Sequence, residues 1–174
     1  MSEFEDKVVI ITGAGGGLGK AHALEFARRG AKVVVNDLGG SADGVGSSSM
    51  ADLVVEEITA AGGQAIANKA SVSDKAGAAS IVEDAVSAFG SVDILVNNAG
   101  ILRDKSFKNM TLDDWDLLIA VHLNGSAYVT HAAWPIMYKK REHPHRALFG
   151  ETKKLRGRCF CAVAALTGWR RLSR

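Results

Sequence analysis

Short apolar runs alternate with longer amphipathic stretches over the first hundred residues of the chain. The apolar runs are KVVIITG, AKVVVND, QAIANKA and VDILVNNAG, which begin at residues 7, 31, 64 and 92. Helix-like stretches lie between them, over residues 17–29, 51–61 and 74–89. Runs that are apolar on both faces are typical of a parallel sheet covered by helices on each side. Because the crossovers in such sheets are right-handed, the pattern predicts an α/β fold with a doubly wound parallel sheet.

A long helix is expected to follow, from Thr111 to about Lys140. Thr111 has the side chain of a helix N-cap, and the acidic residues after it suit the first turn, where the helix dipole favours negative charge. Pro135 is expected to kink or divide this helix, because proline lacks the backbone donor and clashes with the preceding turn. After Arg141 the periodicity ends, and only residues 159–166 are typical of a strand.

The charge of the chain changes sign at the same place. Up to Lys140 the chain has 12 Lys and Arg against 17 Asp and Glu, whereas the remainder has 9 against 2. We therefore expect one incomplete Rossmann-type domain over residues 1–142, truncated after the long helix, and a basic, poorly ordered tail over residues 143–174. The hypothesis that explains so abrupt a change is an out-of-frame translation or a misjoined exon.

The overall composition excludes several classes of protein. Charged residues make up 23% of the 174 residues and the net charge is only +2, which argues against disorder and against a dedicated nucleic-acid binder. No apolar run approaches the roughly 20 residues that cross a bilayer, and the acidic start of the chain is unlike a secretory signal. The two cysteines fit a reducing compartment. We expect a soluble, cytoplasmic protein; a peroxisomal one is the alternative in a eukaryote, although residues 172–174 lack the Ser-Lys-Leu address.

The first candidate site is the glycine-rich segment TGAGGGLG, residues 12–19, between the first apolar run and the first helix. At a strand–glycine turn–helix junction, unsatisfied helix amides and the positive end of the helix dipole attract a pyrophosphate. Glycines let that ligand approach the backbone. A P-loop is excluded, because Ala14 and Ala21 stand where that motif needs a glycine and a hydroxyl residue. The pattern predicts dinucleotide binding through Thr12, Gly13, Gly17, Leu18 and Gly19.

The second candidate is Asp37, which ends the second apolar run twenty residues after Gly17. A carboxylate there can accept hydrogen bonds from the adenosine ribose hydroxyls, whereas it would repel a 2'-phosphate. No Arg or Lys lies between Asp37 and Lys69 to neutralise such a phosphate. The sequence therefore favours NAD over NADP. The alternative is that Asp37 only caps the glycine-rich loop 38–46.

A third motif, Asn97-Asn98-Ala99-Gly100, follows the fourth apolar run. Together with TGAGGGLG it resembles the two hallmarks of the short-chain dehydrogenase/reductase family. The segments VNDLGG, NNAGILRDKSF and VHLNGSAYVT look like the (3R)-hydroxyacyl-CoA dehydrogenase part of peroxisomal multifunctional enzyme type 2 and its bacterial relatives. The resemblance covers residues 5 to about 142.

This resemblance implies an NAD-dependent oxidoreductase of fatty acid metabolism that acts on an acyl-CoA substrate. It implies that Asn98, Ala99 and Gly100 lie beside the nicotinamide ribose. Ser71 and Val72 stand where the family usually has an Asp against the adenine, so the resemblance places an adenine contact there without its carboxylate.

The catalytic residues that the resemblance requires are missing from the sequence. The family uses a tyrosine as general acid/base with a lysine four residues later, but Ala132 follows Tyr128 and Glu142 follows Tyr138 at that spacing. Where many members have an Asn in the long helix this chain has His122, which is either a proton-relay residue or simply a packed or surface histidine. We therefore assign no catalytic residue and expect little turnover.

Two hypotheses about the function remain open. The first is the NAD(H)-binding portion of a short-chain dehydrogenase that is itself catalytically incomplete. The second is a non-catalytic cofactor-binding or interaction protein that pairs with full-length relatives, or with itself, through the helix of residues 111–140. We expect no metal site, because His143-x-His145 and Cys159-x-Cys161 are spaced more tightly than the ligands of structural zinc sites.

Overall fold

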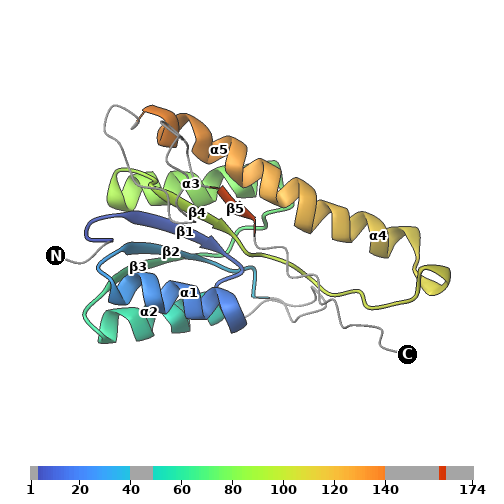
Figure 1. Ribbon diagram of the computed structural model, residues 1–174, viewed down its shortest axis with the longest axis horizontal. Coiled ribbons are helices and arrows are strands. Elements are labelled where there is room, and N and C mark those ends of the chain that lie inside the picture. Colours follow the sequence, from blue (N-terminus) through green and yellow to red (C-terminus); the bar gives the residue numbers. More distant parts are fainter. Residues whose placement is uncertain (1–3, 40–48, 140–160, 164–174) are drawn as a thin grey trace, which may run out of the picture.

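The computed structural model describes residues 4–39, 49–139 and 161–163 (Figure 1). Strands and helices alternate in the first part of the chain as β1 Val8–Thr12, α1 Gly17–Arg28, β2 Lys32–Asn36, α2 Met50–Ala60, β3 Gln64–Asn68, α3 Lys75–Phe89 and β4 Ile94–Asn97. Together with β5, Cys161–Val163, the strands form one parallel sheet in the order β3-β2-β1-β4-β5. The predicted doubly wound fold is therefore confirmed.

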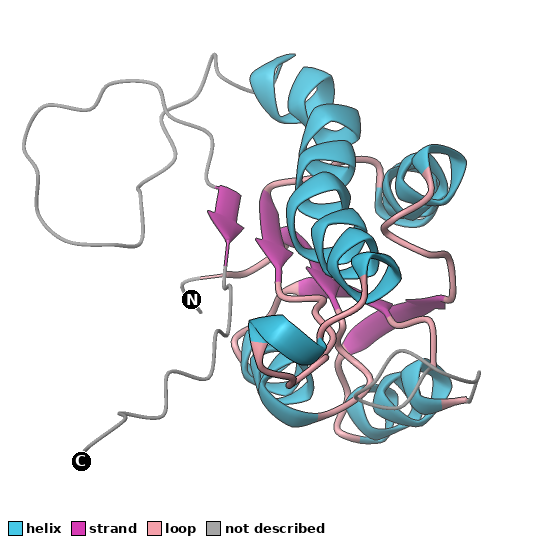
Figure 2. Ribbon diagram, turned by 90° about the vertical axis from the view of Figure 1, so that its right-hand side faces the viewer, coloured by secondary structure: helices cyan, strands magenta, loops and turns pink. Residues whose placement is uncertain are grey.

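Helices cover both faces of the sheet, and Figure 2 shows the strands between the two helical layers. On the central strand β1, Val9 and Ile11 pack against the side of α1 and α2, while Val8 and Ile10 pack against the side of α3 and of the later helix α5 (Ser126–Lys139). All four side chains are fully buried. Burial on both faces explains why the strands are apolar throughout rather than alternating.

The expected long helix begins as predicted but is not uniform. The side chain of Thr111 caps it by accepting a hydrogen bond from the backbone N–H of Asp114 at 3.1 Å. After the short 3-10 helix η1 (Phe107–Asn109), the helical segment runs as α4 (Leu112–Leu118), a π-helical stretch η2 (Ile119–Gly125) and α5 (Ser126–Lys139). The irregular stretch thus lies well before the proline.

The prediction that Pro135 divides the helix is wrong, because α5 continues through it to Lys139. Ala133 and Met137, on either side of the proline, are buried in the core between α5 and α3. This packing holds the last turns of α5 in helical form despite the lost backbone hydrogen bond.

The strand expected within residues 159–166 is confirmed for three of them. Cys161–Val163 form β5, which pairs in parallel with β4 in the register Leu95 with Cys161 and Asn97 with Val163. The edge of β4 offers a row of backbone donors and acceptors, and β5 uses them. The expectations for residues 140–160 and 164–174, including His143, His145 and Cys159, lie outside the described residues.

No helix within residues 4–39 and 49–139 is both long enough and apolar enough to cross a membrane.

Candidate functional site

Four buried polar residues form a row across the carboxyl ends of the strands. Thr12, Asn36, Asn68 and Asn97 are the last residues of β1, β2, β3 and β4, and each is less than 8% exposed. In the sheet, β2 lies next to one edge of β1 and β4 lies next to its other edge, so the chain extends the sheet first in one direction from β1 and later in the opposite direction. Such a switch in strand order at the carboxyl edge is where open α/β sheets bind ligands.

Two glycines of the turn after β1 are required by close packing. A Cβ atom at Gly13 would lie 2.7 Å from the Cα atom of Ala99, and Gly13 itself has a positive φ of 65°. A Cβ atom at Gly19 would lie 2.1 Å from the carbonyl oxygen of Gly13. Gly13 and Gly19, both predicted as site residues, therefore allow the glycine turn, the start of α1 and the segment after β4 to pack closely together.

Gly17 differs from both, because it faces open space. Its φ is +51°, and no described atom lies within 4 Å of the position that its Cβ would take. The adjoining Leu18 is exposed, and no described side chain caps the amino end of α1. The first-turn N–H groups of α1 are thus available to an external acceptor, and the open position at Gly17 gives it room. This donor set fits a pyrophosphate.

Asp37 reaches from the end of β2 to the glycine turn. Its two carboxylate oxygens accept the backbone N–H groups of Gly15 at 2.8 Å and Gly39 at 2.7 Å. The second contact is the loop-capping role that was the structural alternative for this residue. The first places the carboxylate beside the glycine turn, and each oxygen keeps a further acceptor site.

The Asn98-Ala99-Gly100 segment is fixed by the end of β1. The Nδ2 atom of Asn98 donates to the carbonyl oxygens of Thr12 at 3.0 Å and Gly13 at 2.9 Å. The N–H of Ala99 donates to the hydroxyl of Thr12 at 3.0 Å. The Oδ1 atom of Asn98 is buried and has no hydrogen-bond partner among the described residues.

His122 lies in the π-helical stretch η2 and packs against the turn that follows β4. Its Nε2 atom is 3.1 Å from the backbone nitrogen and 2.9 Å from the carbonyl oxygen of Ile101, so it accepts from one or donates to the other according to its tautomer. A Cβ atom at Gly100 would lie 2.7 Å from its Cε1 atom. The geometry places His122 as a packed residue that supports the Gly100–Ile101 backbone.

The structure places Ser71 and Val72 in the loop between β3 and α3. The hydroxyl of Ser71 is 2.8 Å from that of Ser73. The side chain of Val72 is buried, and it lies 2.8 Å from where a Cβ atom would stand on Gly125 of η2. A ligand would therefore meet the backbone of Val72 more readily than its side chain.

Sequence reasoning missed a network that holds this loop. The Nδ2 atom of Asn36 donates to the Oδ1 atom of Asn68 and to the carbonyl oxygen of Ala70, both at 2.9 Å. Asn68 in turn donates to a carboxylate oxygen of Asp84 on α3 at 2.7 Å. The only sequence signal was an asparagine at the end of each of two apolar runs.

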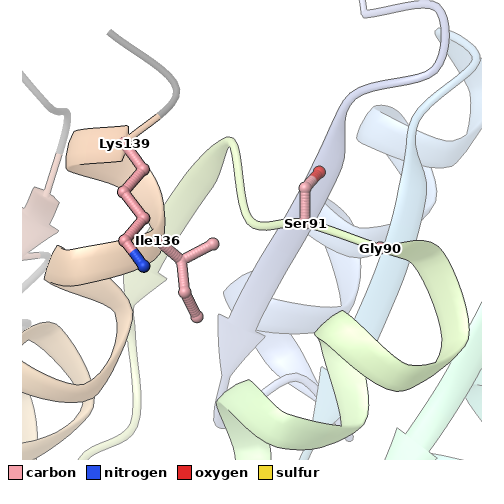
Figure 3. Close-up of a pocket in the computed structure, with 4 residues that line it drawn as sticks. All are labelled: Gly90, Ser91, Ile136 and Lys139. Atoms are coloured by element: carbon pink, nitrogen blue, oxygen red, sulfur yellow. The ribbon is translucent and has the colours of Figure 1, made fainter.

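Hollows elsewhere on the described surface do not adjoin this site. A cavity of about 350 Å³ lies between the start of β4 and α5, lined by Gly90, Ser91, Ile136 and Lys139 (Figure 3). A second, of about 410 Å³, lies between α3 and α5 and shares Ile136. The first is at the amino end of β4, opposite the glycine turn.

Comparisons with known proteins identify relatives of this chain. The family model described as short chain dehydrogenase matches residues 7–143. Peroxisomal multifunctional enzyme A of Dictyostelium discoideum is 63% identical over 138 residues, which cover 79% of this chain and 31% of that protein. Peroxisomal multifunctional enzyme type 2 of Mus musculus is 55% identical over 138 residues, which cover 79% of this chain and 18% of that protein.

A solved structure of a 7α-hydroxysteroid dehydrogenase complexed with NADH and 7-oxo glycochenodeoxycholic acid is also similar. It is 35% identical, with a TM-score of 0.70, and the match covers 78% of this chain and 50% of the other. The chain therefore spans half or less of the length of each of these three proteins.

Proposed function

Because the chain belongs to the short-chain dehydrogenase family, we propose that its carboxyl-edge site binds NAD(H). The observation that carries the proposal is the uncapped amino end of α1 beside the open position at Gly17. It combines unsatisfied amides with space for a pyrophosphate, at the switch point of the sheet. The carboxylate of Asp37, beside the same turn, favours a free 2'-hydroxyl over a 2'-phosphate.

Each element of the site would have a separate task. The amides of Gly17, Leu18 and Gly19 would hold the pyrophosphate, with the turn fixed by Thr12 and Gly13. Asp37 would hold the adenosine ribose, the loop at Ser71 and Val72 would lie against the adenine, and Asn98–Gly100 would lie beside the nicotinamide ribose. When bound, the nicotinamide supplies an acceptor or donor for a hydride.

The proposed family reaction is hydride transfer between NAD and a (3R)-3-hydroxyacyl-CoA, whose C3 hydroxyl must also lose a proton to a base. We propose that Tyr128 does not supply that base, because its half-buried ring packs against the core cluster on the side of α3 and Ala132 stands where the family's lysine would follow it. A positioned proton acceptor contributes about 10²- to 10⁴-fold to such rates. We therefore propose that residues 1–142 bind the cofactor while the 174-residue chain turns over little substrate.

Titration of NADH, followed by its fluorescence, tests the binding proposal. We expect saturable binding and no more than background reduction of NAD by 3-hydroxyacyl-CoA. Absence of NADH binding to the folded chain would overturn the first statement, and robust turnover would overturn the second.

We propose in addition that the helical segment of residues 111–139 pairs with a second copy or with a full-length relative. Phe107 and Leu112 are each more than 80% exposed, and the ring of Phe107 meets that of Trp115 edge to face, with centroids 6.4 Å apart. Exposed apolar clusters of this kind favour association. Light scattering coupled to size exclusion should show a dimer that Trp115→Glu shifts to monomer; a monomer at high concentration would contradict pairing with a second copy.

A further inference from the structure

Asp37 at the end of β2 and Met50 at the start of α2 both pack against the glycine turn, at Gly15 and Gly16. A Cβ atom at Gly15 would lie 2.8 Å from the Oδ2 atom of Asp37 and also 2.8 Å from the Cβ atom of Met50. A Cβ atom at Gly16 would lie 3.0 Å from the terminal methyl of Met50. The thioether side chain of Met50 therefore runs over both glycines, next to the carboxylate.

The backbone donors beside Asp37 are already engaged by it. The N–H groups of Gly15 and Gly39 both donate to the carboxylate, at 2.8 and 2.7 Å. A phosphate group entering here would meet a negative charge and would have to compete for these two amides.

Two lysines of neighbouring elements are engaged in ion pairs. Lys20 of α1 lies 2.7 Å from a carboxylate oxygen of Glu57, and Lys69, after β3, lies 2.6 Å from one of Asp52. Both carboxylates belong to α2, the helix that Met50 begins. A 2'-phosphate would have to break one of these ion pairs to gain a positive partner.

We propose that Met50 is a second determinant of cofactor specificity, which excludes the 2'-phosphate of NADP by occupying the space over Gly15 and Gly16. This proposal rests on NAD(H) binding at the same site. The side chain of Met50 is apolar, cannot donate a hydrogen bond, and lies against the turn residues Gly15 and Gly16. Asp37 excludes the phosphate by charge and Met50 by volume, so removing the charge alone leaves the site closed to NADPH.

The test is a double-mutant cycle with NADH and NADPH as fluorescent ligands. We expect Asp37→Ser to leave NADPH binding weak, and Asp37→Ser combined with Met50→Ala to raise the NADPH-to-NADH affinity ratio at least about fivefold beyond the product of the two single effects. Asp37→Ser combined with Met50→Leu, which keeps the bulk, should show no such gain. Leu53→Ala, one turn later on the exposed side of α2, is the matched control in the Asp37→Ser background.

The outcomes separate this inference from the proposed function. Failure of the wild-type chain to bind NADH would overturn both. NADH binding with a full gain of NADPH affinity from Asp37→Ser alone, or an equal gain with Met50→Leu, would overturn the role of Met50 and leave the site intact. Thermal unfolding of each variant identifies any that fails to fold, in which case Met50→Thr replaces Met50→Ala.

Discussion

Thr12 and Asn98 hold the carboxyl ends of β1 and β4 together through reciprocal hydrogen bonds. The hydroxyl of Thr12 accepts the backbone N–H of Asn98 at 3.0 Å, and the side-chain amide of Asn98 donates to the carbonyl oxygen of Thr12, also at 3.0 Å. The same hydroxyl accepts the N–H of Ala99 at 3.0 Å. One hydroxyl thus fixes the relative position of the two motifs that form the proposed site.

Replacing Thr12 by valine tests this link, because it keeps the shape and removes the acceptor. We predict a loss of about 2 kcal/mol or more in the free energy of unfolding, since each buried N–H without an acceptor costs about 1 to 3 kcal/mol. Urea denaturation measures the loss. Thr12→Ser keeps the hydroxyl and should lose less; equal stability of the valine and serine variants would contradict the role given to the hydroxyl.

The sheet and its helices were predictable from the sequence because their signals are local. The apolar run of residues 8–11 and the glycines after it fix the strand, the turn and the start of α1 without reference to distant residues. The N-cap at Thr111 is equally local, since its partner is only three residues away.

The features that the sequence did not predict depend on contacts between distant segments. The side chain of Asp84 receives its hydrogen bond from Asn68 across the gap between α3 and β3. The continuation of α5 through Pro135 depends on packing against α3. The ring of His122, in the π-helical stretch, contacts the backbone of Ile101, which lies 21 residues earlier in the chain. Met50 approaches Gly15 and Gly16 only after α2 has packed beside α1. The hydrophobic periodicity of the sequence does not indicate contacts between segments so far apart.

A second prediction separates the ligand-facing glycine from a structural one. Gly17 and Gly62 both have positive φ, at 51° and 83°, and no described atom lies within 4 Å of either Cβ position. Alanine at either position should therefore cost about 1 to 2 kcal/mol of stability through backbone strain alone.

Only Gly17→Ala should also weaken NADH binding, by at least about tenfold, because its methyl group enters the space beside the amides of α1. Titration of both variants with NADH measures the difference. If both variants bind NADH like the wild type, the ligand does not occupy the open side of Gly17.

A third prediction concerns Asp84, which is exposed on α3 and holds the amide of Asn68. Asp84→Ala should release that amide and loosen the Asn36–Asn68 contact that fixes the loop at Ala70. We predict a stability loss of about 1 kcal/mol and a several-fold weaker affinity for AMP, which contains only the adenosine end of the cofactor.

Competition of AMP against NADH measures this effect. Glu83→Ala removes the same charge from the neighbouring exposed position and is the matched control. Asp84→Asn keeps an acceptor and should restore most of the affinity. If Asp84→Ala lowers stability but leaves the AMP affinity at the wild-type value, the network is structural only.

A fourth prediction concerns the acid stability that Glu25 provides. Hydrogen bonds from Arg28 and then from Arg29, which lie three and four residues after Glu25 at the end of α1, lower the pKa of the Glu25 carboxyl from 4.5 to about 2. A carboxyl whose pKa is lower in the folded state stabilises the fold above its unfolded pKa and loses that contribution as the pH falls through the folded value. The contribution is therefore fully present above about pH 5 and disappears between about pH 4.5 and pH 2.

Thermal unfolding of Glu25→Gln and the wild type across this range measures the contribution. The difference in Tm should be largest near neutral pH, shrink toward pH 2, and be smaller in 1 M salt, because these partly exposed ion pairs are screened. Glu56→Gln, on the exposed side of α2 and outside the ion pairs described above, is the matched control for replacing a glutamate on a helix surface. A Tm difference for Glu25→Gln that stays constant from pH 7 to pH 2 would mean that the lost packing of the side chain, and not its charge, causes the destabilisation.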